Sequence, residues 1–303
     1  MHVTCSNLGA VGWFGNQFYR YLALMYLSER HNQKIQTSEW LGEQIFNLPC
    51  NRPDNSLEYK IVNEEGGKHS KELYKPDRSK VLALEDFENN NYDVLTHNNA
   101  FYHTSYLKEH KDSILEKLQF NEGIQTKLIP QIKEFLNLKD EEEFVVVHAR
   151  MTLGGYHNKW KFPFEWYRQK LNQIKREKGE TIKKIVICSD DPGLVFQGLS
   201  EFDLININDF IRYELKPCDT AKEVARPGAI GGTGCFNFTP DFVIMTLCDE
   251  LLTSDSTFSY AAAMLNQKPN ARFYKSSIQD QKLVQYDPWN SHLLNFRTHQ
   301  WGI

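Results

Sequence analysis

Two side chains that could bind an anion follow directly after a buried apolar run. Residues 144–147 read FVVV, and His148 and Arg150 come next. A run that is apolar on both faces is typical of a central parallel strand covered by helices. Ligands of open α/β sheets bind outside the carboxyl ends of such strands, and a guanidinium grips phosphate through two hydrogen bonds. The sequence therefore favours a phosphate ligand here, the alternative being a buried histidine and an arginine paired with a carboxylate.

A second anion-binding element is predicted at a helix start. The strand expected at 250–253 leads into the polar run SDST, residues 254–257, and then into a helix at 257–266. Hydroxyls and free backbone N–H groups at a helix N-terminus form an anion site. The simpler interpretation is that this run only caps the helix.

Acidic residues mark two other helix starts. In SDDP, residues 189–192, Asp191 is predicted to cap a helix, while Asp190 either holds a ribose or base or closes the turn. Thr239 is predicted to cap a helix whose first turn contains Asp241. The adjacent acids at 190–191 lack the spaced oxygen ligands of a divalent site, and no His/Cys cluster completes one, so we expect no metal.

Glycine-rich segments give mainly exclusions. Residues 9–15 follow a short strand at 2–5 and read G-x-x-G-x-x-G, which is not the dinucleotide fingerprint G-x-G-x-x-G. A buried helix is expected next, from Asn16 to about Ser28. The loop GAIGGTG, residues 228–234, lacks the Gly-Lys-Ser/Thr of a P-loop. Neither a nicotinamide site nor a nucleoside-triphosphatase is indicated.

The elements that would position these residues alternate regularly in the second half of the chain. Strands are expected at 144–149, 183–188, 203–207, 250–253 and 271–274, with helices at 164–177, from Pro192, at 240–248 and at 257–266. Such alternation predicts an α/β fold with a parallel sheet and helices on both faces.

The first half of the chain is harder to interpret. Residues 50–95 are polar and broken, which predicts loops, and a helical pattern interrupted near Asn121 runs from about 105 to 138. The acidic stretch after this pattern is taken as a boundary between domains at 1–140 and 141–303.

Composition is that of an ordinary globular protein. The chain has 303 residues, 41% hydrophobic and 24% charged, with a net charge of -4, so neither disorder nor a nucleic-acid footprint is indicated. Six cysteines without a C-x-x-C pair are expected to be reduced thiols. No stretch approaches the ~18 apolar residues of a membrane span. We therefore expect a soluble cytoplasmic protein, or a catalytic domain whose anchor was removed.

Four segments in order resemble the GDP-fucose-dependent fucosyltransferases, most closely the α-1,2-fucosyltransferases of glycosyltransferase family 11. They are GAVGWFGNQFYRY at 9–21, FYHTSYLKEHKDSI at 101–114, VHAR at 147–150, and ICSDDP at 187–192 with DFVIMTLCDELLTSDSTFS at 241–259. The resemblance implies a GT-B fold of two Rossmann-like lobes with a mostly parallel sheet in each, the first lobe on the acceptor side and the second binding the nucleotide sugar.

The same resemblance implies roles for individual residues. Arg150 would bind the β-phosphate of the donor, and His148 and Asp241 would help seat the guanosine. The phosphate cradle would be completed by Ser256, Thr257 and Phe258, while Gly15 and Asn16 would face the cleft from the first lobe. The family is metal-free and inverting, so Arg150 and the helix N-terminus would do what Mg²⁺ does elsewhere.

One departure from the family is plain. Its pattern H-x-R-R-G-D-Y is replaced after Arg150 by MTLGGY, residues 151–156, without a second Arg or an Asp. An inverting transfer normally uses a base on the acceptor hydroxyl, and the candidates are His157, Glu165 and His103. The aromatic residues expected to hold the acceptor are Trp13, Phe101, Tyr102 and Trp160.

The resulting hypothesis is a metal-independent transferase that moves L-fucose from GDP-fucose to a glycan hydroxyl, with no nucleic-acid partner. One alternative keeps the fold and the chemistry but changes the nucleotide sugar, which the altered segment after Arg150 supports. The other is a noncatalytic glycan or nucleotide-sugar binding protein. Arg150 and the SDSTFS run, residues 254–259, argue against it.

Overall fold

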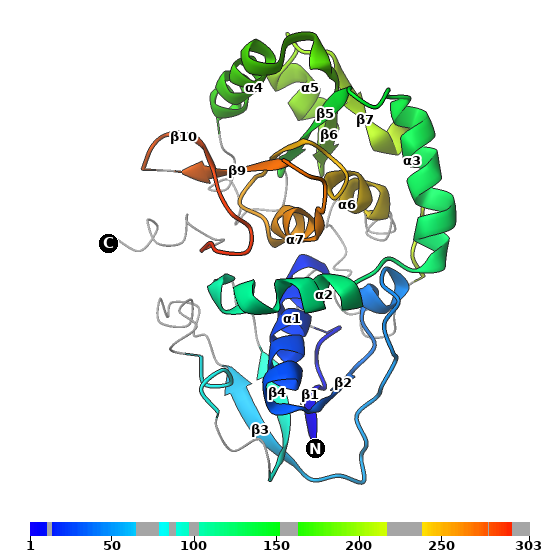
Figure 1. The fold of residues 1–303 in the computed structure, drawn as a ribbon, viewed down its shortest axis with the longest axis vertical. Helices are drawn as coiled ribbons and strands as arrows, with labels where there is room; N and C mark the ends of the chain where they lie inside the picture. The colour runs from blue at the N-terminus through cyan, green and yellow to red at the C-terminus, as the bar shows by residue number, and fades with distance from the viewer. Residues whose placement is uncertain are drawn as a thin grey trace. The chain divides into compact units, whose positions relative to one another are not determined.

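The computed structural model of the chain describes residues 1–10, 14–64, 79–84, 89–96, 103–151, 163–216, 238–277 and 279–292. These residues divide into two compact units. The first comprises Met1–Glu122 and two short segments that begin at Leu215 and Trp289. The second comprises Gly123–Glu214 and a later segment that ends at Pro288. Each unit contains strands and helices, most of which are labelled in Figure 1.

The first unit ends earlier than the sequence-based boundary at residue 140, because the helix before that boundary packs in the second unit. Helix α3 (Ile129–Leu136) carries Phe135, whose ring centroid lies 5.0 Å from that of Phe210. Lys184 Nζ donates to the Phe135 carbonyl at 2.8 Å. These contacts hold α3 beside the second sheet.

The first unit is built on a four-stranded parallel sheet in the order β2-β1-β4-β3. Its elements are β1 (His2–Cys5), α1 (Phe14–His31), β2 (Lys34–Thr37), β3 (Tyr59–Glu64), β4 (Asn91–Thr96) and α2 (Lys111–Lys117), with 3-10 helices at Leu41–Gln44 and Ser105–His110. The expectation of loops throughout 50–95 is wrong for β3 and β4. Both strands are polar, and Ile61 in the edge strand β3 is 68% exposed, so neither gives a clear apolar pattern.

Helix α1 is the core helix of this unit. It runs from Phe14 to His31, slightly beyond the expected 16–28, and 12 of its residues are buried. Arg30 and His31 in the last turn suit the negative end of the helix dipole. Asn32, at φ 50°, ends the helix in the left-handed conformation that Asn tolerates well.

The second unit contains a six-stranded sheet in the order β10-β9-β8-β5-β6-β7, parallel except for β10. Its strands are β5 (Glu143–Ala149), β6 (Ile182–Ser189), β7 (Leu204–Asn206), β8 (Glu250–Leu252), β9 (Arg272–Ser277) and β10 (Lys282–Gln285). Its other helices are α4 (Phe164–Lys178), α5 (Pro192–Gly198), α6 (Thr239–Met245) and α7 (Thr257–Leu265). The predicted α/β class, with a mostly parallel sheet in each of two lobes, is confirmed.

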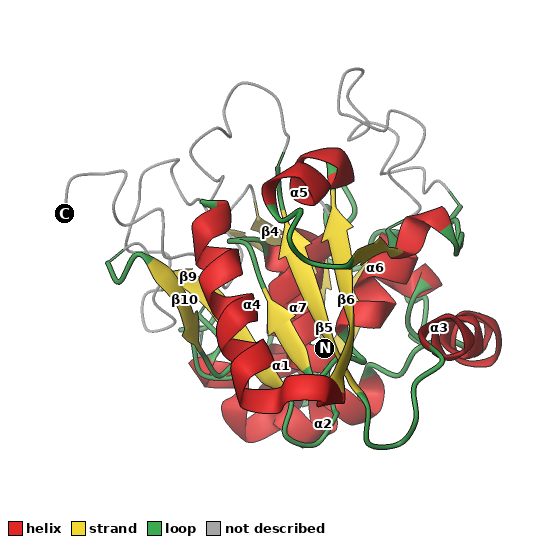
Figure 2. Ribbon diagram, turned by 90° about the horizontal axis from the view of Figure 1, so that it is seen from above, coloured by secondary structure: helices red, strands yellow, loops and turns green. Residues whose placement is uncertain are grey.

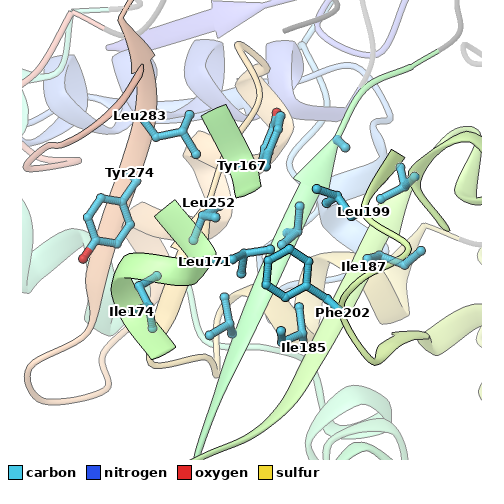
Figure 3. Close-up of a cluster of buried hydrophobic side chains, with 14 of the residues drawn as sticks. Tyr167, Leu171, Ile174, Ile185, Ile187, Leu199, Phe202, Leu252, Tyr274 and Leu283 are labelled. Atoms are coloured by element: carbon cyan, nitrogen blue, oxygen red, sulfur yellow. The ribbon is translucent and has the colours of Figure 1, made fainter. Parts of the chain in front are cut away.

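Side chains of successive strand residues alternate between the two faces of this sheet. On one face, Val145 and Val147 of β5 and Ile185 and Ile187 of β6 pack against α4 in a fully apolar cluster (Figure 3). The alternate strand residues face α6 and α7, which lie across the sheet from α4 (Figure 2). Both faces are therefore covered, as the unbroken FVVV run predicts.

None of the helices among the described residues is long and apolar enough to cross a membrane.

Candidate functional site

The order of the strands in the second sheet defines where a crevice lies. From β5 the chain moves outward to β6 and β7, and it then returns to the other side of β5 for β8 and β9. The connections from β5 and β8 thus run in opposite directions, which makes the carboxyl ends of β5 and β8 a topological switch point. The residues that follow β5 and β8 lie at this edge of the sheet.

His148 is held at the end of β5 by the loop after β8. Its Nδ1 lies 2.8 Å from Ser254 Oγ, and the Ser254 N–H donates to the His148 carbonyl at 2.9 Å. Burial, and secondarily the charge of Arg150, lower the pKa of His148 to about 3. The imidazole is therefore neutral at physiological pH, and the contact with Ser254 holds its Nδ1 side at the end of β5.

Arg150, two residues further, is a partly buried cation. Burial lowers the pKa of its guanidinium, while the nearby carboxylates Asp190 and Asp255 oppose that shift. An arginine still keeps its charge in proteins, because its ordinary pKa lies above ~12. A positive charge therefore persists at the end of the central strand, where an anionic ligand would be attracted.

The N-terminus of α7 adds backbone donors to this edge. Ser256 is the N-cap, and its Oγ accepts the Phe258 N–H at 3.4 Å. The predicted cap is thus confirmed, and Thr257 is the first helical residue. The Phe258 ring centroid lies 5.7 Å from that of His148, so the helix start is next to the β5 end. The positive end of the helix dipole lies on the same side as Arg150.

The end of β6 is occupied by two carboxylates with different roles. Asp191 caps α5 by accepting the Leu194 N–H at 3.1 Å, as predicted. Asp190 accepts the Met151 N–H at 2.6 Å through Oδ1 and so ties the segment after β5 to the end of β6. This bond runs to the segment after the neighbouring strand and does not close the turn at 189–192, and a ligand role of Asp190 stays a hypothesis.

Asp241 lies in the first turn of α6 at the same edge. Its backbone carbonyl lies 3.8 Å from the thiol of Cys188, which pairs in register with His148. Asn208 Nδ2 donates to Asp241 Oδ1 at 2.8 Å, and burial raises the pKa of the carboxyl to about 7. The predicted N-cap role of Thr239 is wrong, because α6 begins at Thr239 itself and no side chain caps it.

Gly15 and Asn16 belong to the first unit, in the first turn of α1. Gly15 is buried, and Asn16 is partly exposed. The next residue fixes this turn, since Gln17 Nε2 donates to the Gly9 carbonyl at 3.1 Å and Gln17 Oε1 accepts the Leu41 N–H at 3.4 Å. A buried amide therefore connects Gly9 and Leu41 to the first turn of α1.

Several predicted residues lie outside the described part of the chain. They are Trp13, Phe101, Tyr102, His157, Trp160 and the loop 228–234. Of the other two base candidates, Glu165 is exposed and bonded to Arg168 and Gln169, and the bonds from both lower its pKa. His103 lies in the first unit, with Nδ1 2.7 Å from Ser105 Oγ. Within the described ranges, no three His, Cys, Asp or Glu side chains converge as a metal site would require.

Comparisons with known proteins bear on the fold. No family model and no curated protein matches the sequence. Among solved structures, fucosyltransferase NodZ from Bradyrhizobium is similar, with a TM-score of 0.57, 14% identity, and coverage of 95% of this chain and 99% of that one. The chain has the fold of a GT-B fucosyltransferase.

Two further structures support this assignment of the fold. NodZ α-1,6-fucosyltransferase soaked with GDP-fucose matches with a TM-score of 0.54 at 12% identity, covering 94% of this chain and 99% of that one. A mutant of Arabidopsis thaliana FUT1 in complex with GDP matches with a TM-score of 0.52 at 12% identity, covering 96% and 74% of the respective chains. The likeness thus extends over nearly the whole chain.

Proposed function

We propose that this protein is an inverting, metal-independent glycosyltransferase that moves L-fucose from GDP-fucose to a hydroxyl of a glycan acceptor. The observation that carries the proposal is the group at the switch point of the second sheet: a neutral, buried His148, the charged Arg150 and the N-terminus of α7. The fold adds support, because NodZ has been co-crystallised with GDP and its crystals have been soaked with GDP-fucose.

In the proposed reaction the acceptor oxygen attacks the anomeric carbon of fucose as the bond to the β-phosphate oxygen breaks. The electron pair of that bond stays on the departing GDP, so negative charge grows on its β-phosphate. Arg150 and the α7 N–H groups would stabilise that charge, which is the kind of preorganised electrostatic contribution that dominates many enzyme rates. The acceptor proton would pass to a base that lies outside the residues assigned above.

The same residues would fix the nucleoside. We assign Asp241, with Asn208 beside it, and His148 to the guanosine, and Ser256, Thr257 and Phe258 to the phosphates and their surroundings. A carboxylate that accepts two N–H groups suits guanine, because guanine offers adjacent ring and exocyclic N–H donors on one edge. We assign the α-1,2 linkage from the order of the four sequence segments, whereas the similar NodZ is an α-1,6-fucosyltransferase.

Binding of nucleotides tests the proposal. The melting temperature is measured with GDP, UDP, CMP and dTDP in EDTA, since a ligand at ~100 times its Kd stabilises by about 2.7 kcal/mol. Stabilisation by GDP above the others, followed by transfer from GDP-fucose in EDTA and linkage analysis of the product, supports the assignment. A preference for UDP would replace the donor, a strict Mn²⁺ requirement would contradict the metal-free mechanism, and tight GDP-fucose binding without turnover would indicate a binding protein.

A further inference from the structure

Lys275, a cation in addition to Arg150, lies in the same cross-strand row as His148. Val147 of β5 pairs with Leu252 of β8, and Leu252 pairs with Tyr274 of β9, all in the apolar cluster under α4. By alternation, the next residues His148 and Lys275 point to the opposite face, toward α6 and α7. Two strand spacings separate them, or ~10 Å between Cα atoms. Lys275 therefore belongs to the carboxyl edge and to the same face as the candidate site.

The start of α7 lies between these two residues. On one side, Phe258 of α7 faces the His148 ring at 5.7 Å. On the other side, the ring of Tyr260 lies 5.7 Å from that of Tyr286, and Lys275 Nζ lies 5.5 Å from the Tyr286 ring centroid. The helix N-terminus is thus flanked by the β5 end on one side and by Lys275 on the other.

Charge and burial distinguish Lys275 from a surface lysine. Its side chain is 9% exposed, and the nearby Asp255 is 3% exposed and accepts the Tyr260 hydroxyl at 3.0 Å. Asp255 interacts electrostatically with both Arg150 and Lys275, and Asp190 interacts with Arg150 as well. Burial lowers the pKa of Lys275 despite the opposing effect of Asp255. A further anion at this place would favour the charged form of both cations.

We propose that Lys275 is the second cation of the donor site and binds the diphosphate from the side of α7 opposite Arg150. The inference rests on the proposed function and adds a residue to it. It also accounts for the missing second arginine after Arg150, since the residue there, Met151, is 4% exposed and packs in the apolar cluster under α4. The second positive charge comes from β9 instead of from the end of β5.

The competing interpretation is that Lys275 only balances Asp255 and stabilises the turn between β8 and α7. The two interpretations predict different effects on ligand affinity. A structural pair affects folding and every ligand alike, whereas a phosphate-binding cation affects diphosphates and leaves the nucleoside unchanged.

The test measures Kd values of GDP, guanosine and pyrophosphate by calorimetry for the wild type and for Lys275→Met, Lys275→Gln and Lys275→Arg. Loss of one charge-assisted contact should raise the Kd of GDP and of pyrophosphate about 10- to 100-fold in the Met and Gln variants. The Kd of guanosine should change less than about twofold, and Lys275→Arg should keep most of the affinity.

Lys170→Met is the matched control. Lys170 is also partly buried with a lowered pKa, and its Nζ lies 4.4 Å from the ring centroid of Tyr274, the neighbour of Lys275 on β9. It contacts the other face of the strand, because Tyr274 faces α4. This variant should bind GDP and pyrophosphate as the wild type does.

Two results would overturn the inference: unchanged diphosphate affinity in Lys275→Met and Lys275→Gln, or equal losses for GDP and guanosine. The proposed donor can fail separately. If the wild type prefers UDP to GDP, the same comparison is made with UDP and uridine, and Lys275 is judged on that pair. A wild type that binds neither nucleoside diphosphate nor pyrophosphate overturns both proposals.

Discussion

Buried charges are stabilised differently at the two edges of the second sheet. At the amino edge, Glu250 is 0% exposed at the start of β8, where it accepts from Arg272 Nε at 2.7 Å and lies 2.9 Å from Lys178 Nζ. Burial opposes the charged forms there, but Glu250 and the other carboxylate partners more than compensate and raise the pKa of both cations. At the carboxyl edge, burial prevails and lowers the pKa of Arg150 and Lys275.

This difference separates a structural network from the proposed binding site. Arg272 also reaches Glu177 at 3.0 Å, and Lys178 reaches Glu143, so the amino edge holds its charges without any ligand. The carboxyl edge also contains carboxylates, Asp190 and Asp255, but for its two cations they do not outweigh the effect of burial. These cations lie with the neutral His148 and a helix N-terminus, so an anionic ligand would add more favourable energy at the carboxyl edge than at the amino edge. We therefore expect changes at the amino edge to alter stability and changes at the carboxyl edge to alter ligand binding.

The largest effect expected at the carboxyl edge follows from Arg150→Ala. Removing a preorganised charge from the leaving phosphate should lower the rate of fucose transfer about 100- to 1000-fold, as measured by GDP release in the presence of acceptor. Arg150→Ala also removes a cation from the buried Asp255, so the melting temperature is measured with the rate to separate a loss of stability from a loss of catalysis.

Arg168→Ala is the control for this variant. Arg168 lies on α4, where it pairs with Glu165 at 2.6 Å and with Glu201, and exposed pairs of this kind contribute little. Its transfer rate should equal that of the wild type. Near-normal turnover in Arg150→Ala would show that the carboxyl edge is not the phosphate site.

The amino edge should respond in the opposite way. Glu250→Gln leaves Arg272 and Lys178 without their shared buried carboxylate, and breaking such a group should lower the free energy of unfolding by about 3 kcal/mol in urea titrations. The Kd of GDP for the folded variant should not change. As a control, Glu180→Gln removes an exposed residue that lies 3.8 Å from Lys183 and should cost less than about 0.5 kcal/mol. A loss of GDP affinity without loss of stability in Glu250→Gln would break the division between the two edges.

The features of the site that could be predicted from the sequence are those that depend on residues close together in the chain. The caps Asp191 and Ser256 bond to N–H groups two or three residues away, so residue type and position are enough to find them. The strand that ends at His148 is equally clear, because a continuous apolar run of this kind requires cover on both faces.

Contacts between distant segments could not be predicted in this way. Ser254 is 106 residues from His148, and Asn208 is 33 residues from Asp241. Each pair depends on the strand order and register, which only the packing of the whole unit determines. Lys275 gave no signal in the sequence, since a lysine in a short strand near the C-terminus is ordinary until its row and burial are known. The strands β2, β3 and β4 were missed for a related reason, because four to six polar or mixed residues carry little periodicity.

The smallest expected effect concerns Asp241, and it sharpens the comparison because stability and binding should move in opposite directions. Burial raises the pKa of this carboxyl to about 7, so between pH ~4 and 7 the folded state holds a proton that the unfolded state releases. Stability from this group is therefore lost as the pH rises toward 7. Asp241→Asn removes that penalty and should stabilise the fold at pH 8 by roughly 1–3 kcal/mol, with little difference at pH 4.

The ligand should reverse this preference. An ionised Asp241 is needed to accept the N–H groups of guanine, so the wild-type affinity for GDP should rise with pH through about 7, while Asp241→Asn should bind GDP weakly and independently of pH. Parallel urea titrations and calorimetry at pH 4, 6 and 8 measure both quantities. A wild-type GDP affinity that does not change with pH would show that Asp241 does not bind the guanine base. A less stable Asp241→Asn at pH 8 would show that the Asn208 bond, and not the cost of burying the charge, dominates at this end of the sheet.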